Sequence, residues 1–214
     1  MRRTLLLDLD GTLVDSVPDL LSSINRMMAA RGLAGFTAPE VTAMVGDGAA
    51  ALVGTVMAAR GLGASAADVD AFIADYTAHA SAETRPYAGV PETLGRLRED
   101  GWRLGVCTNK PVEAARRLLE ALGLAGQFAA IGGGDSYPMR KPHPGHLLHL
   151  IAAMGATPDD AIMVGDHHND VLAAAGAGLP CIFAAWGYGP MKMSEGAAAV
   201  AQRVTDLPEL LARL

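Results

Sequence analysis

Hydrophobic residues recur along this chain with two different periods, and the change of period predicts its elements. Residues 4–9 form a short, mostly apolar run of the kind found in buried strands. From Val17 onward, apolar residues instead recur every three or four positions as far as Gly32, which predicts an amphipathic helix. Three further helices are predicted over residues 40–45, 49–60 and 68–80. We therefore expect the region 15–85 to be entirely helical, without a strand.

Beyond Pro86, predicted strands and helices alternate. Strands are predicted over residues 103–107, 129–132, 161–164, 180–184 and 200–204. Helices are predicted over residues 90–99, 112–122, 144–154, 170–175 and 207–214. Alternation of this kind is typical of an α/β fold with a doubly wound parallel sheet and helices on both faces. The sequence thus predicts an α/β core domain made of residues 1–14 and 86–214, with an all-helical domain, residues 15–85, inserted after the first strand.

Composition narrows the class of protein. The chain has 214 residues, of which 50% are hydrophobic, as is typical of a globular protein and not of a disordered one. A formal net charge of −6 argues against binding to nucleic acid or to an anionic membrane surface. No stretch is long enough to span a bilayer, so we expect a cytoplasmic protein, either a monomer or a homodimer. Cys107 and Cys181 lie in short apolar runs and are expected to be buried, reduced thiols.

The first strand ends in two carboxylates. Asp8 and Asp10 are separated by one residue and are followed by Gly11 and Thr12. Taken alone, an Asp-Gly pair after an apolar run is equally well explained as an ordinary turn. A calcium-binding EF-hand loop does not fit, because its glycine occupies the sixth position and Gly11 is fourth counted from Asp8. Ligands of α/β sheets bind at the carboxyl ends of strands, so the other strand ends decide between a turn and a site.

Other predicted strands also end in polar groups. Thr108 and Asn109 follow the second strand, Asp166 and Asp170 follow the fourth, and Lys141 precedes the helix that leads into the fourth. In a strand order such as 3-2-1-4-5, the first and fourth strands are neighbours. We therefore expect four carboxylates to lie together, with Thr108 and Lys141 on the other flank. The four carboxylates are those of Asp8, Asp10, Asp166 and Asp170.

Four carboxylates in one crevice cannot all remain ionised without a cation. Magnesium (Mg2+) is the simplest choice, because hard divalent cations prefer oxygen ligands. The lysine, the hydroxyl and the backbone amides of the loop would then face an anion, and together these groups suit phosphoryl transfer. Each group alone has an ordinary structural explanation, but their shared position at one edge of the sheet favours a site.

In this arrangement the chain resembles the haloacid dehalogenase-like (HAD) phosphohydrolase superfamily. Its four motifs correspond to Asp8-Leu9-Asp10, Thr108-Asn109, Lys141, and Asp166 with Asp170. Flanking segments are similar to the phosphoglycolate phosphatase branch: Leu13-Val14-Asp15-Ser16, Val45-Gly46-Asp47-Gly48, Tyr87-Ala88-Gly89-Val90, Thr108-Asn109-Lys110-Pro111, Gly133-Gly134-Asp135, Lys141-Pro142-His143-Pro144 and Trp186-Gly187-Tyr188-Gly189. The resemblance implies a HAD-like Rossmannoid core, and it implies that the helical insert is a cap domain.

The resemblance also implies a role for each motif residue. Asp8 is the implied nucleophile, which becomes an aspartyl-phosphate, and Asp10 is the implied general acid and then general base. The implied ligands of Mg2+ are Asp8, the backbone carbonyl of Asp10, and Asp166, with Asp170 supporting the metal. The implied phosphate-binding groups are Thr108, Asn109 and Lys141, together with backbone amides near Asp10 and Thr12.

The implied activity is magnesium-dependent hydrolysis of a small phosphate monoester, with phosphoglycolate as the leading candidate. A phosphomutase of the same superfamily, similar to β-phosphoglucomutase, is an alternative. A catalytically silent binding protein on this scaffold is a less favoured one. A hydrolytic dehalogenase needs neither Asp10 nor magnesium and is therefore not favoured. The expected partner is a small phosphorylated metabolite.

Three features lie outside the motifs. The segment Gly46-Asp47-Gly48 interrupts the helical region and is weakly indicated as a substrate-specificity loop, although a plain helix–helix turn explains it equally well. His167 and His168 replace the small polar residue and the arginine that are usual in the branch, which affects local charge and fine specificity. The histidines at positions 143, 146 and 149 do not favour a zinc site, because their spacing rotates them apart on a helix.

Overall fold

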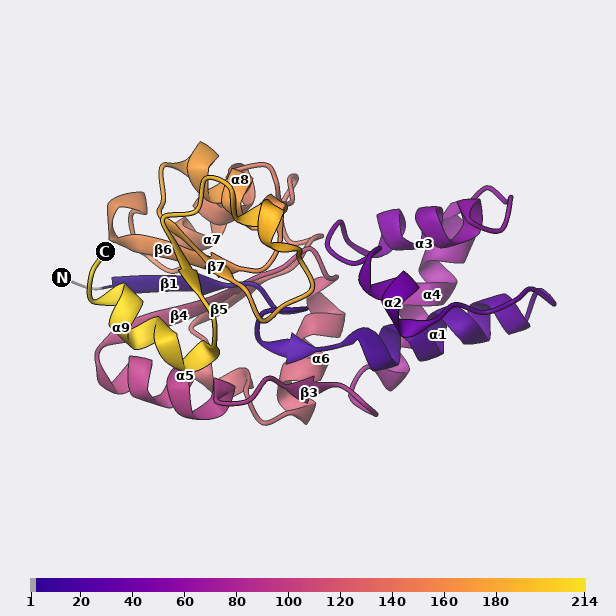
Figure 1. The fold of residues 1–214 in the computed structure, drawn as a ribbon, viewed down its shortest axis with the longest axis horizontal. Helices are drawn as coiled ribbons and strands as arrows, with labels where there is room; N and C mark the ends of the chain where they lie inside the picture. Colours follow the sequence, from indigo (N-terminus) through magenta and orange to yellow (C-terminus); the bar gives the residue numbers. More distant parts are fainter. Residues whose placement is uncertain (1–2) are drawn as a thin grey trace.

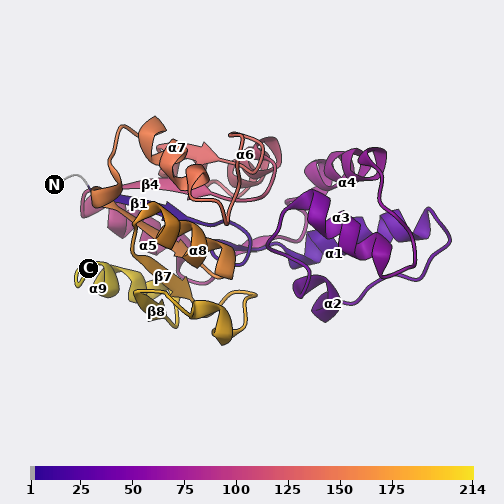
Figure 2. The ribbon, with the colours of Figure 1, turned by 90° about the horizontal axis from the view of Figure 1, so that it is seen from above.

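The computed structural model describes residues 3–214, so the first two residues of the predicted core domain lie outside the described residues. Figure 1 shows an α/β part built on one sheet, and a bundle of helices that lies beyond one end of it. In both views (Figure 1 and Figure 2), the start of the first strand and the C-terminus lie at the opposite end of the α/β part. The helical bundle therefore extends from the edge of the sheet where the first strand ends.

The sheet has six strands, and every neighbouring pair is parallel. Their spatial order is β5 (Ala130–Gly132), β4 (Trp102–Cys107), β1 (Arg3–Leu7), β6 (Ala161–Gly165), β7 (Cys181–Ala184) and β8 (Ala199–Ala201). This order confirms the predicted α/β fold with a doubly wound parallel sheet. It places β1 between β4 and β6, so the residues that follow these three strands meet at one edge.

The apolar run of β1 supplies side chains to two cores, because successive residues of a strand face opposite sides of the sheet. Leu5 and Leu7 pack against α5, α6 and α9, whereas Leu6 packs against α7 and α8. These helices are α5 (Val90–Glu99), α6 (Val112–Ala121), α7 (Gly145–Ala153), α8 (His168–Ala177) and α9 (Leu207–Leu211). Short 3-10 helices are η1 (Ala125–Gln127), η2 (Pro158–Asp160), η3 (Met191–Ser194) and η4 (Val204–Asp206). Both faces of the sheet are thus covered, as predicted.

The helical bundle has a core of its own. It comprises α1 (Val17–Ala29), α2 (Ala38–Thr42), α3 (Ala49–Ala58) and α4 (Ala66–His79). The buried side chains that join these helices include Ile24, Met28, Val53 and Phe72. Within α1 and within α3, the buried residues recur every three or four positions, which is the helical period from which the bundle was predicted. The insertion of a helical unit after β1 is therefore confirmed.

Two short strands connect the bundle to the α/β part. β2 (Val14–Asp15) and β3 (Arg85–Pro86) pair antiparallel. The expectation that region 15–85 contains no strand is therefore wrong at both ends of that region. A strand of two residues is too short to show alternation, and its partner lies far away in the sequence. The division into two domains at these positions remains a prediction.

Cys107 and Cys181 are free and buried, as predicted. Burial raises the pKa of the Cys107 thiol to about 12, so it stays protonated at neutral pH. Among residues 3–214, no helix is both long enough and apolar enough to cross a membrane.

Candidate active site

Three buried carboxylates meet at the carboxyl edge of the sheet. Asp8 follows β1, Asp166 follows β6, and Asp170 lies in the first turn of α8. One oxygen from each lies within 4.8 Å of the other two. The parallel pairing of β1 with β6, with Leu7 opposite Val164, brings them together. Within the described part of the chain, this is the only group of side chains with the composition and spacing of a metal site.

Burial and mutual repulsion disfavour negative charge in this cluster. Burial raises the pKa of Asp8 to about 6, while Lys141 opposes the rise and Asp170 adds to it. Burial raises the pKa of Asp166 to about 8, and the charges of Asp8 and Asp170 act in the same direction. A cation at the cluster would stabilise the ionised carboxylates. The donor set consists of oxygens only, which fits a hard divalent cation.

Lys141 neutralises part of this charge. Its Nζ donates to the backbone oxygen of Cys107 at 2.6 Å and to Asp170 Oδ1 at 2.6 Å, and it lies 3.0 Å from Asp8 Oδ1. Burial acts to lower the pKa of Lys141, but the carboxylates of Asp170 and Asp8 outweigh burial and raise it. The lysine expected to bind phosphate is therefore charged at neutral pH and is fixed beside Asp8.

The side chain of Asp166 is held by two groups from other loops. Thr12 Oγ1 donates to its Oδ1 at 2.8 Å, and the backbone N–H of Tyr188 donates to its Oδ2 at 2.8 Å. Gly11 has a φ of +82°, and a Cβ there would lie 2.3 Å from Asp166 Oδ2, so this turn requires glycine. Thr12, which was expected to help place phosphate, thus directs its hydroxyl at Asp166.

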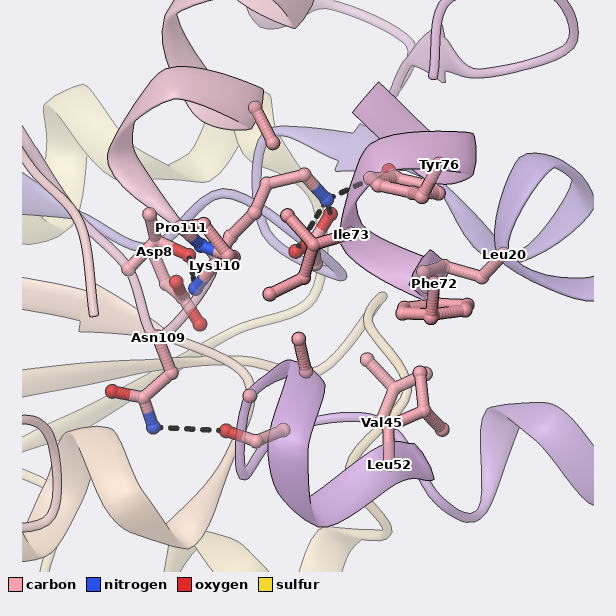
Figure 3. Close-up of a pocket in the computed structure, with 16 residues that line it drawn as sticks. Asp8, Leu20, Val45, Leu52, Phe72, Ile73, Tyr76, Asn109, Lys110 and Pro111 are labelled. Atoms are coloured by element: carbon pink, nitrogen blue, oxygen red, sulfur yellow. Dashed lines mark hydrogen bonds and ion pairs between the residues drawn. The ribbon is translucent and has the colours of Figure 1, made fainter. Parts of the chain in front are cut away.

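The carboxylate of Asp10 lies apart from the cluster. Both of its oxygens accept hydrogen bonds from Lys110 Nζ, at 2.8 and 3.0 Å, and the same nitrogen donates to the Tyr76 hydroxyl at 2.7 Å. Figure 3 shows Lys110 reaching from the α/β part toward Tyr76 of the bundle helix α4. The expectation of four neighbouring carboxylates is therefore wrong for Asp10, whose neighbour is an ammonium.

Lys110 and Tyr76 are the functional candidates that the sequence did not indicate. Lys110 directly follows Thr108 and Asn109, and this position is the signal from which it could have been found. No sequence pattern distinguishes Tyr76 from the other apolar positions of its helix, because its importance comes from contact with the α/β part.

Thr108 and Asn109 continue β4 toward the cavity. The backbone N–H of Thr108 donates to Gly132 at 2.9 Å, which extends the pairing of β4 with β5. The hydroxyl oxygen of Thr108 accepts from the backbone N–H of Lys110 at 3.2 Å. The amide nitrogen of Asn109 donates to the backbone oxygen of Lys141 at 2.9 Å. The motif residues after β4 are thus tied to the other elements of the site.

The bundle loop of residues 46–48 rests against the α/β part. Asn109 Nδ2 donates to the backbone oxygen of Gly46 at 3.0 Å, as drawn in Figure 3. Asn169 Nδ2 donates to Asp47 Oδ1 at 2.7 Å. The loop that the sequence indicated therefore borders the site. The side chain of Asn109, which was expected to hold phosphate, holds this loop.

His167 packs against the same loop. A Cβ on Gly46 would lie 2.8 Å from His167 Nε2, so the ring leaves room only for glycine there. Its Nδ1 accepts from the backbone N–H of Asn169 at 3.3 Å. Burial and then the neighbouring His168 lower the pKa of His167. The ring is therefore neutral at neutral pH and adds no positive charge to the site.

The histidines around α7 pack as part of the fold. Tyr137 stacks on His149 at 5.1 Å between ring centroids, and it meets His146 edge-on at 5.7 Å. Among the residues that the structure describes, none of these histidines joins a group with metal-site spacing.

A cavity of about 570 Å³, including its open mouth, lies between Asp8 and the helical bundle. The charged side chains that line it are those of Asp8, Asp10 and Lys110 from the α/β part, which also contributes Thr108 and Asn109, whereas the hydroxyl of Tyr76 comes from α4. The opposite wall is mostly apolar, and Figure 3 shows its side chains Leu20, Val45, Leu52, Phe72 and Ile73. The cavity has one polar and one apolar wall, so it suits a small molecule whose reacting group faces Asp8.

The haloacid dehalogenase-like hydrolase family model matches residues 2–178. This chain belongs to the haloacid dehalogenase-like hydrolases. A phosphoglycolate phosphatase from Agrobacterium fabrum is 45% identical over 192 residues, which cover 88% of this chain and 82% of the relative. A phosphoglycolate phosphatase from Rhodospirillum rubrum is 40% identical over 220 residues, which cover 99% of this chain and 91% of the relative.

A solved structure is similar along the whole length of this haloacid dehalogenase-like hydrolase. It is described as that of a predicted phosphoglycolate phosphatase from Haemophilus somnus, and it matches with a TM-score of 0.87 at 29% identity. The match covers 98% of this chain and 97% of that one. The resemblance inferred from the sequence motifs is therefore confirmed, whereas the roles of individual residues remain predictions.

Proposed function

We propose that this protein is a magnesium-dependent phosphatase that hydrolyses phosphoglycolate, a small phosphate monoester. The observation that carries the proposal is the placement of Asp8, which lies beside Lys141 and in a cluster with Asp166 and Asp170. A carboxylate nucleophile, a lysine and an oxygen-only metal site together suit phosphoryl transfer. The relatives named phosphoglycolate phosphatases support the choice of substrate.

In this proposal Mg2+ is held by Asp8, Asp166 and the backbone carbonyl of Asp10, with Asp170 as a supporting group. When bound, the metal supplies positive charge to the phosphate oxygens. The raised pKa values of Asp8 and Asp166 support the assignment, because they belong to carboxylates that lack sufficient counter-charge.

In the first step, a carboxylate oxygen of Asp8 attacks phosphorus, and the bond between phosphorus and the ester oxygen breaks. For this step Asp10 must carry a proton in place of one of its two hydrogen bonds from Lys110, and it gives that proton to the departing glycolate oxygen. The products are glycolate and an aspartyl-phosphate on Asp8. Lys141, 3.0 Å from Asp8, is in position to stabilise negative charge on the phosphoryl oxygens.

In the second step, water attacks the aspartyl-phosphate, and Asp10 accepts a proton from that water. The bond between phosphorus and the Asp8 oxygen breaks, which releases inorganic phosphate and regenerates the carboxylate. Thr108 and backbone amides near Asp10 and Thr12 complete the binding of phosphate. The side chain of Thr12 binds Asp166, and the side chain of Asn109 binds the bundle loop. We therefore assign the binding of phosphate at these two positions to the backbone. The helical bundle acts as a cap that excludes bulk water.

The experiment that tests this function is a screen of purified protein with Mg2+ against a panel of small phosphate monoesters. We expect phosphate release, with phosphoglycolate as the best substrate by kcat/KM. Isomerisation of a sugar phosphate without phosphate release would identify a phosphomutase instead. Binding of a monoester without any turnover would identify a silent binding protein.

A further inference from the structure

The substrate of the proposed function carries two anionic groups, and the cluster around Asp8 accounts for only one of them. The second group, a carboxylate, must lie in the cavity that faces the helical bundle. That side of the cavity is mostly apolar, and burying a carboxylate there without a partner is unfavourable. Of the described residues that line the cavity, Lys110 is the only cationic one.

The environment of Lys110 leaves it able to accept a second anion. Its ammonium group has three N–H donors, and they point to the two oxygens of Asp10 and to the hydroxyl of Tyr76. The contact with Asp10 is therefore double, and one of the two hydrogen bonds can be exchanged while the other persists. Lys110 Nζ lies 2.8 Å from Asp10 Oδ1, which is the distance of an ion pair.

Tyr76 offers a donor at the same place. Its oxygen accepts a hydrogen bond from Lys110, and the hydrogen bonds of the described residues give its own O–H proton no acceptor. Burial raises the pKa of Tyr76 to about 12, so the hydroxyl stays protonated at neutral pH. An ammonium and a phenolic O–H therefore lie side by side on the cavity wall, as Figure 3 shows.

We propose that Lys110 and Tyr76 bind the carboxylate of the substrate and so determine which leaving group the enzyme accepts. This inference rests on the proposed function. In phosphoglycolate the carboxylate carbon is two bonds from the ester oxygen that Asp10 protonates. A group in contact with Asp10 is therefore within reach of that carboxylate when the ester oxygen faces Asp10. The apolar side chains of Phe72 and Leu52 exclude water, which strengthens the ionic contact.

The test compares phosphoglycolate with ethyl phosphate, which has a methyl group in place of the carboxylate. Tyr76→Phe removes the O–H and keeps the ring, and Tyr137→Phe makes the same change at a residue that does not line the cavity. We expect Tyr76→Phe to lower kcat/KM for phosphoglycolate by about tenfold, the usual loss for a hydrogen bond to a charged group. The ratio of kcat/KM for phosphoglycolate to that for ethyl phosphate should fall, because any effect of Tyr76 on Asp10 through Lys110 is common to both substrates. Tyr137→Phe should leave this ratio unchanged.

Lys110→Met is a stronger test, but it also removes the hydrogen-bond partner of Asp10 and so slows the hydrolysis of both substrates. The informative quantity is therefore the ratio of the two kcat/KM values, in which the common effect cancels. We expect this ratio to fall by a further factor of about ten or more beyond Tyr76→Phe. An unchanged ratio in both variants would overturn the proposal, because Lys110 and Tyr76 would then act only by positioning Asp10.

Binding to an inactive variant separates this inference from the proposed function. Calorimetry is carried out in the Asp8→Asn background with Mg2+. It should show that Tyr76→Phe weakens the binding of phosphoglycolate by about tenfold and leaves the binding of ethyl phosphate unchanged. If the wild type hydrolyses other monoesters but not phosphoglycolate, the assigned substrate is wrong, and the same calorimetry still decides whether these residues bind a carboxylate. If Tyr76→Phe weakened the binding of both ligands equally, the proposal that Tyr76 contacts the substrate carboxylate would be wrong.

Discussion

Tyr188 joins the carboxylate cluster to the connection between the two parts of the molecule. Its backbone N–H donates to Asp166 Oδ2 at 2.8 Å, and its hydroxyl donates to Asp15 Oδ1 at 2.9 Å. The hydroxyl oxygen also accepts from the backbone N–H of Ser16 at 2.7 Å. Asp15 belongs to β2, and Ser16 directly precedes α1. One residue therefore orients a candidate metal ligand and also fixes the path of the chain into the helical bundle.

Tyr188→Phe should lower the free energy of unfolding by about 1 kcal/mol, because Asp15 and Ser16 lose a hydrogen-bond partner. Urea unfolding measures this, with Tyr137→Phe as the matched control. The affinity for Mg2+ should be retained, because the contact with Asp166 comes from the backbone. A large loss of Mg2+ affinity would show that the side chain, and not only the backbone, orients Asp166.

Asp8→Asn should reduce phosphate release by about a thousandfold or more, because an amide is a poor nucleophile. The variant should be at least as stable as the parent in the absence of metal, since burial disfavours the charge of Asp8. Steady-state phosphate release and thermal unfolding measure the two effects. Asp70→Asn, at an exposed position of α4, is the control for the substitution itself. Turnover near the parent rate would contradict the role of Asp8.

Asp8 and Asp166 should make the metal-free protein less stable as the pH rises from about 4 to about 8, whereas the lowered pKa of His146, about 4, acts in the opposite direction up to about pH 6.5. The pKa values of Asp8 and Asp166 are about 6 and about 8 in the folded chain, against 3.8 in the unfolded chain. Between these values the two carboxylates hold more protons in the folded chain than in the unfolded one, so their contribution favours unfolding as the pH is raised. Thermal unfolding in a chelator at several pH values measures this.

Two further observations bear on the same pH dependence. Asp166→Asn should flatten its upper part, and added Mg2+ should raise the Tm most at the alkaline end. If Asp166→Asn and the parent instead showed the same pH dependence of the metal-free Tm, the raised pKa of Asp166 would be wrong.

Removal of divalent cations should silence the enzyme reversibly. Among the described residues, the only cluster with the spacing of a metal site consists of carboxylates. A chelator should therefore reduce phosphate release to background, and excess Mg2+ should restore it. The measurement is phosphate release before chelation, after dialysis against chelator, and after Mg2+ is added back. Activity that survives thorough chelation would contradict a magnesium-dependent mechanism.

Asp47→Ala should raise KM several-fold and leave the free energy of unfolding within about 0.5 kcal/mol. The side chain of Asp47 accepts a hydrogen bond from Asn169, and its loss loosens the bundle loop at the mouth of the site. Steady-state kinetics with phosphoglycolate measures the effect, and Asp70→Ala is the control. An unchanged KM would show that this contact does not influence substrate binding.

The sequence predicted those parts of the fold that depend on local pattern. Leu5, Leu6 and Leu7 form an unbroken apolar run because β1 is covered on both faces, and such a run is visible without a structure. The meeting of Asp8 with Asp166 could also be predicted, because parallel strands bring their carboxyl ends to one edge.

The rest depended on contacts between distant segments. The pairing of β2 with β3 involves too few residues to leave a pattern. The direction of the Asp10 carboxylate is set by Lys110, and the position of Lys110 is set in part by Tyr76 from the helical bundle. A motif identifies which residues border a site, but the packing of the bundle decides which way each side chain turns.

The paired connection between the two parts of the molecule also constrains how the bundle can move. Val14 lies opposite Pro86 and Asp15 opposite Arg85, so the outgoing and returning segments are bonded to each other. Two independent tethers would let the bundle swivel freely, whereas a ribbon of two bonded strands bends mainly across its flat face. We therefore expect opening to follow a single arc that returns Tyr76 to Lys110 after each turnover. The accuracy with which the site reassembles is then a property of four residues that do not line the cavity.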